Sequence, residues 1–320
     1  MPVGFIQGRF NYSLDVFDEP VKKALEKQIK DLGYNPRELL PVMEVAIEEA
    51  KKIVDKEKIP LSTRILRAEI EKHAYTYIHG VLKQSKKWKL ARECIRSYCS
   101  VFLVGAGISF ESGVPLTKCL EDLLKFCGAK DYDDLRIDEK KCYNFKSEFR
   151  KICDRKDVGA SHKLIVKNFP KFILEIICLN WDNLIERAAK ELGKSINKVN
   201  EDVAVRDERH LWKFHGDIEN IKRSNIKGKG GWIFPNEGGY VFNCFLDYIK
   251  RTELENSMFT FIIVGYSEGE EKIYDNIISH FEKKIPRPTF RIGLNLKRLG
   301  EEKYIVGPAD FILKQVLPIE

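Results

Sequence analysis

The sequence predicts an α/β protein with a doubly wound, mostly parallel sheet of the Rossmann-like type, preceded by a mainly helical N-terminal domain. Three observations lead to this prediction. From residue 91 onward, short apolar segments alternate with stretches of helical periodicity, as in a parallel sheet covered by helices. The apolar run VFLV at residues 101–104 leads directly into a turn rich in small residues. Residues 1–90, in contrast, carry mainly helical periodicity.

The first 90 residues are expected to form a separate helical domain with a regulatory or oligomerisation role. Apolar residues recur at helical spacing over residues 19–30, 37–55 and 64–81, which predicts three helices. The charged stretch KQSKKWK at residues 83–89 is the candidate linker. Residues 91–320 then form the second domain.

In residues 91–320 the pattern predicts six strands and six helices. The strands are expected at residues 101–104, 172–178, 211–214, 258–264, 289–294 and 303–306. The helices are expected at residues 115–127, 145–154, 159–168, 182–192, 269–284 and 308–316. Residues 218–250 interrupt the alternation with several glycines and are expected to form a small inserted lobe.

Composition and charge exclude several classes of protein. The formal net charge is +7, and the basic residues are interspersed rather than clustered, so a nucleic-acid partner is not expected. The apolar runs are far too short to span a membrane, and the first ten residues lack the apolar core of a signal peptide. We therefore expect a soluble, cytoplasmic protein. The eight cysteines include no Cys-x-x-Cys pair, so no metal is expected.

The turn after residues 101–104 is the first candidate binding site. Gly105, Ala106 and Gly107 follow the apolar run at once, and Gly113 stands shortly before an expected helix. Glycines let the backbone approach a ligand, and free N–H groups at a helix start attract a phosphate or pyrophosphate. The third glycine is displaced from the usual dinucleotide spacing, so a purely structural turn remains an alternative at this point.

Polar residues follow the other expected strands as well. They are Asn180 and Asp182 after the second strand, His215 after the third, Gly265 and Ser267 after the fourth, and Asn295 after the fifth. Ligands of doubly wound sheets bind at the carboxyl ends of the strands. We therefore expect these residues to line one cleft.

These motifs together resemble the signature of the sirtuin (Sir2) family. GAGIS with SGVP at residues 105–109 and 112–115 is similar to the family's G-A-G-x-S-x-x-S-G-I-P. NWD at 180–182 resembles its N-I-D, FHG at 214–216 its L-H-G, GYS at 265–267 its G-T-S, and GLNL at 293–296 its I-N-L segment. The resemblance covers roughly residues 95–320, with the motifs in the family's order. It implies a Sir2-type fold and NAD as the substrate.

Two departures from the family pattern narrow the expected activity. Only Cys244 lies beyond His215, so the zinc ribbon of two cysteine pairs found in sirtuin deacylases cannot form. LTK at residues 116–118 also replaces the usual Asp-Phe-Arg. Such departures resemble the branch of Sir2-like proteins that hydrolyse NAD, many of them in prokaryotic antiviral defence. An NAD-dependent protein deacylase or ADP-ribosyltransferase, and a non-catalytic sensor of NAD or ADP-ribose, remain the alternatives.

The resemblance also assigns roles to residues. His215 is the expected catalytic base, because an imidazole titrates near neutral pH and can take a proton from a ribose hydroxyl or from water. Asn180 would orient the nicotinamide ribose or the attacking water. Asp182 would recognise nicotinamide, cap the following helix, or do both. The other histidines, His162 and His210 among them, are expected to be structural.

The remaining assignments concern binding. Ser109 would add a hydroxyl donor to the loop that holds the pyrophosphate, and Ser267 and Asn295 would hold the adenosine ribose and phosphate. The N-terminal domain faintly resembles an ATP-cone in Gly8-Arg9, in Phe17-Asp18 and in the STRI sequence at residues 62–65. This second resemblance implies an adenine nucleotide as a further ligand, and a homo-oligomer is expected.

Overall fold

The computed structural model describes residues 14–56, 63–110, 112–114, 120–199, 208–217, 240–265, 277, 281 and 287–318. The chain divides into two compact units, Met1–Lys83 and Gln84–Glu320. Among the described helices, none is long and apolar enough to cross a membrane.

The first unit is built from three packed helices. A 3-10 turn, η1 (Leu14–Phe17), leads into α1 (Asp18–Asp31), α2 (Leu40–Lys56) and α3 (Thr63–Leu82), and each helix contacts the other two. Val21, Leu25 and Ile29 of α1 recur at intervals of four and are fully buried. Burial of such a stripe is what makes a helix of this length stable in water.

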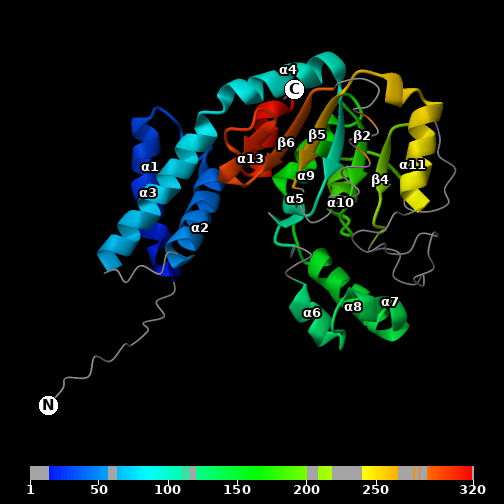
Figure 1. The fold of residues 1–320 in the computed structure, drawn as a ribbon, viewed down its shortest axis with the longest axis horizontal. Coiled ribbons are helices and arrows are strands. Elements are labelled where there is room, and N and C mark those ends of the chain that lie inside the picture. Colours follow the sequence, from blue (N-terminus) through cyan, green and yellow to red (C-terminus); the bar gives the residue numbers. More distant parts are fainter. Residues whose placement is uncertain are drawn as a thin grey trace. The chain divides into compact units, whose positions relative to one another are not determined.

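The second unit is organised around a seven-stranded sheet in which every strand pairing is parallel (Figure 1). The strand order is β3-β4-β2-β1-β5-β6-β7. This architecture confirms the predicted doubly wound α/β fold. The strands are β1 (Ser100–Val104), β2 (Ile173–Cys178), β3 (Asn197–Val199), β4 (His210–Lys213), β5 (Thr260–Val264), β6 (Thr289–Gly293) and β7 (Tyr304–Val306).

Helices cover both faces of this sheet. Trp212 of β4 packs its ring on Phe245 of α11, whereas the next residue, Lys213, reaches Glu186 of α10. Successive side chains of a strand point to opposite faces, so α11 and α10 lie on opposite faces. The described helices of this unit are α4 (Ser85–Tyr98), α5 (Gly107–Phe110), α6 (Glu121–Phe126), α7 (Tyr132–Ile137), α8 (Glu139–Asp154), α9 (Ala160–Asn168), α10 (Leu184–Glu191), α11 (Tyr240–Arg251) and α13 (Ala309–Val316).

A buried carboxylate fixes β2, β4 and α11 to one another at the start of the strands. Glu175 of β2 accepts hydrogen bonds from the backbone N–H of His210, from Trp212 Nε1 and from the hydroxyl of Tyr248. A buried ionised group is tolerated only when such donors satisfy it. The bond from His210 comes from its backbone, and its ring packs beside those of Trp212 and Tyr248.

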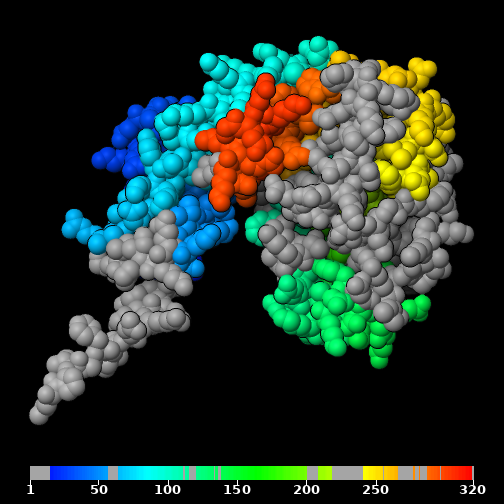
Figure 2. Space-filling model, in the orientation of Figure 1, coloured from blue at the N-terminus to red at the C-terminus, as the bar shows by residue number. Residues whose placement is uncertain are grey.

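Helices α6, α7 and α8 form a lobe of their own, drawn in green in Figure 1 and projecting from the rest of this unit in Figure 2. The lobe contacts the segment that follows β2, because Tyr132, Phe145 and Phe149 pack around the indole of Trp181, with ring centroids 6.0–6.4 Å apart. Aromatic pairs at such separations add to the energy of burial.

Several details differ from the sequence-based expectation, and one of them is that α7 was not predicted. Lys83–Lys89 is not a linker, because α4 begins at Ser85 and buries Trp88, Ala91 and Ile95 along one stripe. The short strand β3 was not predicted. Within the expected inserted lobe, residues 218–239 lie outside the described part of the chain, and α11 packs against β4. Most of the expected helix at 269–284 also lies outside it.

Candidate functional site

The strand register brings the predicted motifs to one edge of the sheet. Val104 of β1 pairs with Cys178 of β2 and with Val264 of β5, and Cys178 pairs with Lys213 of β4. The ladder continues beyond the strands, because Leu179 N–H donates to Val104 O and Phe214 N–H donates to Cys178 O. Adjacent strands lie about 4.8 Å apart. Asn180 and His215, each two residues beyond an aligned pair, therefore lie on neighbouring strands at the carboxyl edge.

The turn after β1 is locked to the end of β5 by a close backbone approach. Gly107 N–H donates to Gly265 O at 2.7 Å, and Gly105 N–H donates to Val264 O. A Cβ on Gly107 would stand 2.7 Å from Gly265 Cα, so only glycine fits there. The sequence motif thus marks a contact between two backbones as well as a turn.

Most N–H groups of this turn are already used inside the protein. Those of residues 107–110 and 112–114 all donate to backbone carbonyls within the turn or on Gly265. Among the described residues of the turn, only the N–H of Ala106 has no acceptor in the protein. The expected pyrophosphate cradle therefore offers one free backbone donor among these residues.

Ser109 and Asn180 meet below this turn. The Asn180 side chain donates through Nδ2 to Ser109 Oγ at 2.9 Å and to Gly105 O at 3.2 Å. Ser109 is 1% exposed and Asn180 5%. The structure therefore brings the first and second predicted motifs into direct contact.

His162 of α9, which was expected to be a structural residue outside the site, belongs to the same group. Its Nε2 lies 3.3 Å from Ser109 Oγ, and the side chain is completely buried. Burial lowers the pKa of His162 to about 4, so the imidazole is neutral at pH 7. His162 Nδ1 and Asn180 Oδ1 are buried atoms without a hydrogen-bond partner among the described residues. Two buried polar atoms are thus left available to a ligand or to water.

Asp182 serves the start of α10. Its Oδ1 accepts a hydrogen bond from Leu184 N–H at 3.1 Å, and its carbonyl accepts one from Lys213 Nζ. Asp182 thus satisfies the first N–H of α10 from the position before the N-cap residue, Asn183, and it is 4% exposed.

His215 stands in a tight turn at the end of β4. Gly216 N–H donates to Lys213 O, and Gly216 has φ of +83°, a conformation that favours glycine. A position at the end of a strand, followed by glycine, would leave the His215 ring accessible, but the residue is 2% exposed.

The remaining predicted binding residues have different surroundings. Gly113 has φ of +78° and lies beside the ammonium group of Lys156. Asn295 follows β6, is exposed, and accepts a hydrogen bond from the N–H of Lys297 through Oδ1. Ser267 lies outside the described residues.

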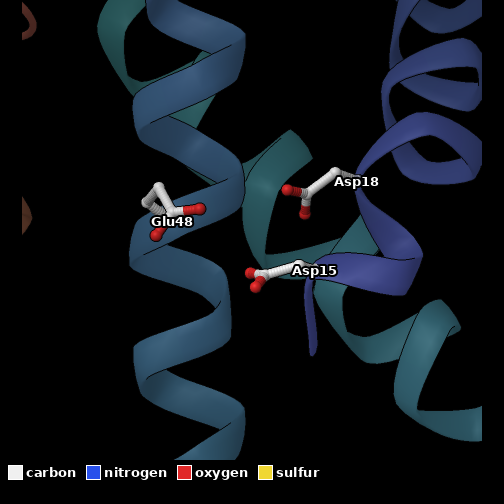
Figure 3. A group of neighbouring side chains, drawn as sticks. All are labelled: Asp15, Asp18 and Glu48. Carbon is white, nitrogen blue, oxygen red and sulfur yellow. The ribbon is translucent and has the colours of Figure 1, made fainter. Parts of the chain in front are cut away.

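One acidic cluster in the first unit resembles a metal site but already holds a cation. Asp15, Asp18 and Glu48 direct their carboxylates toward one another (Figure 3). The ammonium of Lys51 lies 2.5–3.0 Å from an oxygen of each, and these hydrogen bonds outweigh burial to raise the pKa of Lys51. The cluster is thus an ion-pair network.

Comparison with known proteins supports the same fold and motifs. The sequence profile of the family described as "SIR2-like domain" matches residues 174–292, a range that includes Asn180, Asp182 and His215 but not the turn after β1. No curated protein sequence matches the chain. Two solved structures, both complexes of a mutant Sir2 homologue with ADP-ribose, have a TM-score of 0.50 at 17% and 16% identity. Each alignment covers 71% of this chain and 95% of the other chain. One segment of the chain thus matches the SIR2-like profile, and the fold is similar to that of the Sir2 homologues.

Proposed function

We propose that the second unit binds NAD and hydrolyses it to nicotinamide and ADP-ribose. The observation that carries the proposal is the meeting of Gly105, Ser109 and Asn180 at the carboxyl edge of the sheet, with His215 on the neighbouring strand. This edge is where doubly wound sheets bind nucleotides. The matched SIR2-like segment and the ADP-ribose complexes of the similar structures support NAD as the ligand.

The residues present fit a dinucleotide. The free N–H of Ala106 is a donor suited to a pyrophosphate oxygen, and the close approach of Gly107 to Gly265 leaves no side chain in the way. The nearby ammonium of Lys156 favours an anion beside Gly113. Asn180 Oδ1 is a buried acceptor suited to a ribose hydroxyl or a water molecule.

Hydrolysis breaks the bond between nicotinamide and the ribose C1′. Nicotinamide leaves with the bonding electron pair, water adds its oxygen to C1′, and one proton of that water is released. In our proposal His215 takes this proton, directly or through a ribose hydroxyl. Asn180 orients the hydroxyl or the water without adding a charge beside a cationic centre. The neutral His162 holds Ser109, which in turn fixes the Asn180 amide.

Hydrolysis is favoured over protein deacylation by the cysteine content. Only Cys244 follows His215 in the sequence, so two pairs of zinc-binding cysteines cannot form there. We further propose, from the resemblance alone, that NAD hydrolysis serves antiviral defence. Loss of protection in cells carrying the His215→Ala protein would be the corresponding result.

Nicotinamide release from NAD by the purified protein tests the activity. We expect release by the wild type and a loss of at least about 100-fold in His215→Ala and Asn180→Ala. Gly300→Ala is the matched control, because a Cβ on Gly300 meets no atom within 4 Å. Undiminished release in both site variants would contradict the assigned roles.

Two other outcomes would identify the alternatives. Nicotinamide release that occurs only with an acylated peptide or an acceptor protein would identify a deacylase or a transferase. Binding of NAD in a calorimeter, without nicotinamide release over hours, would identify a sensor.

A further inference from the structure

Two buried charged residues bracket His215. Lys213 stands two positions before it and Asp217 two positions after it, and both are 0% exposed. Removing a charge from water costs several kcal/mol unless it is paired. The residues that pair with these two charges are therefore important for the position of the turn that contains His215.

Lys213 and Asp217 are the two ends of one chain of alternating charges. Lys213 Nζ lies 3.8 Å from Glu186 Oε1, the same oxygen lies 3.7 Å from Lys198 Nζ, and Lys198 Nζ lies 2.5 Å from Asp217 Oδ2. Burial raises the pKa of Glu186 to about 7, so the two positive and two negative charges cancel only when this carboxylate is ionised. This chain of charges runs from Lys213 on β4 through Glu186 on α10 and Lys198 on the edge strand β3. It ends at Asp217, the residue after Gly216.

The Lys213 end also reaches the segment that carries Asn180. Its ammonium donates a hydrogen bond to Asp182 O and lies 3.9 Å from Cys178 Sγ, both on or just after β2. One side chain thus contacts the residue two positions before Asn180 and the residue two positions after it. This bridge links the Asn180 segment to the strand that leads to His215.

We propose that the chain Lys213–Glu186–Lys198–Asp217 is a positioning device that holds the His215 turn in place against the Asn180 segment. The inference rests on the proposed function, because it assigns the device to NAD hydrolysis. None of the four residues is placed in contact with substrate, so they act through His215.

Stability alone does not account for these charges. Replacing a buried ion pair by apolar side chains of similar volume is often neutral or stabilising. Besides the packing that buries His215, the hydrogen bond from Gly216 N–H to Lys213 O opposes a displacement of this turn. Ion pairs anchored at both ends restrict that motion, which is what a catalytic base requires.

Kinetics of Lys198→Met and Asp217→Asn test the proposal. Both changes leave in place Lys213, which bridges β4 to the segment that follows β2. We expect kcat for nicotinamide release to fall about 10- to 100-fold, with KM for NAD changed less than about threefold, because a displacement near 1 Å costs up to about 100-fold. The matched control is Lys194→Met, which removes an ammonium bound to three carbonyls at the end of α9.

The test that separates positioning from general destabilisation uses His215→Ala as the background. Residues that act only through His215 have no further effect on the residual rate once the imidazole is gone. Lys198→Met or Asp217→Asn should then leave the rate of the His215→Ala protein unchanged. An equal fold-loss in both backgrounds, or an unchanged kcat in the wild-type background, would overturn the proposal.

A second measurement does not depend on turnover. In protein labelled at histidine, the ring signals of His215 are assigned by their loss in His215→Ala. We expect these signals to shift or broaden in Lys198→Met and Asp217→Asn but not in Lys194→Met. Unchanged ring signals would reject the positioning role even if NAD were hydrolysed. Altered signals in a protein that releases no nicotinamide would instead reject the proposed function and leave the positioning of His215 intact.

Discussion

The contact between Gly107 and Gly265 leads to a quantitative prediction for Gly107→Ala. The added Cβ would stand 2.7 Å from Gly265 Cα and 2.9 Å from Gly265 O, with backbone on both sides of the contact. Ordinary contact begins at 3.4 Å, so the turn after β1 and the end of β5 must separate by about 0.7 Å. No flexible side chain is available to absorb the movement.

The size of the effect follows from two contributions. Overpacking of this kind costs about 1–3 kcal/mol. The hydrogen bond from Gly107 N–H to Gly265 O is stretched by the same movement, which costs about 1 kcal/mol more. A total of about 2–4 kcal/mol lowers the midpoint of thermal unfolding by about 4–16 °C for a unit of this size. The displaced turn also carries Ser109, so nicotinamide release should fall about 10- to 100-fold.

Thermal unfolding and nicotinamide release, measured on the same preparations, check both parts. Gly300→Ala serves as the control, because it adds the same methyl group where no atom lies within 4 Å. If Gly107→Ala matched Gly300→Ala in both unfolding temperature and rate, the close approach of the two backbones would be refuted, and with it the described geometry of the turn.

Two further predictions concern buried ionisable groups. Burial lowers the pKa of His162 from 6.5 to about 4, so its contribution to stability is complete above pH 6.5 and is lost as the pH falls toward 4. Relative to His162→Gln, the wild type should lose about 3 kcal/mol of unfolding free energy between pH 7 and pH 4, measured by denaturant titration, and parallel pH profiles would contradict this. In the first unit, Lys51→Met should cost about 1–3 kcal/mol because three carboxylates lose their common cation, whereas its exposed neighbour Lys52→Met should cost less than about 0.5 kcal/mol. Equal losses in the two lysine variants would show that the acidic cluster does not need the Lys51 ammonium.

The sequence predicted most strands of the sheet, because a short apolar run between turn residues is typical of a buried strand. It missed β3, whose Asn197 and Lys198 give a three-residue edge strand no hydrophobic pattern. It missed α4 because the first turn of this helix is charged. The buried apolar stripe, which starts at Trp88, is therefore hard to detect in the sequence. In such a segment only the few buried positions are apolar, so the helical period of the apolar residues is weak.

The candidate site was predictable only in part, because motifs show which residues follow a strand but not what their side chains contact. The contact between Ser109 and Asn180 shows that the first two motifs meet, whereas the expected common cleft stays a prediction. His162 comes from a different helix and carries no local signal that would link it to Ser109. Lys213 is a charged residue in a strand, which by pattern alone indicates the surface, yet it is fully buried. Charges paired across three elements cannot be read from spacing along one chain.

The indole of Trp181 lies between two site residues in sequence and among the rings of α7 and α8 in space. Any rearrangement that carries the α6–α8 lobe away from the sheet must alter the surroundings of this indole. Its emission would therefore report such a motion from beside Asn180. An optical signal for opening and closing is thus built into the polypeptide, and no attached dye is needed to follow it.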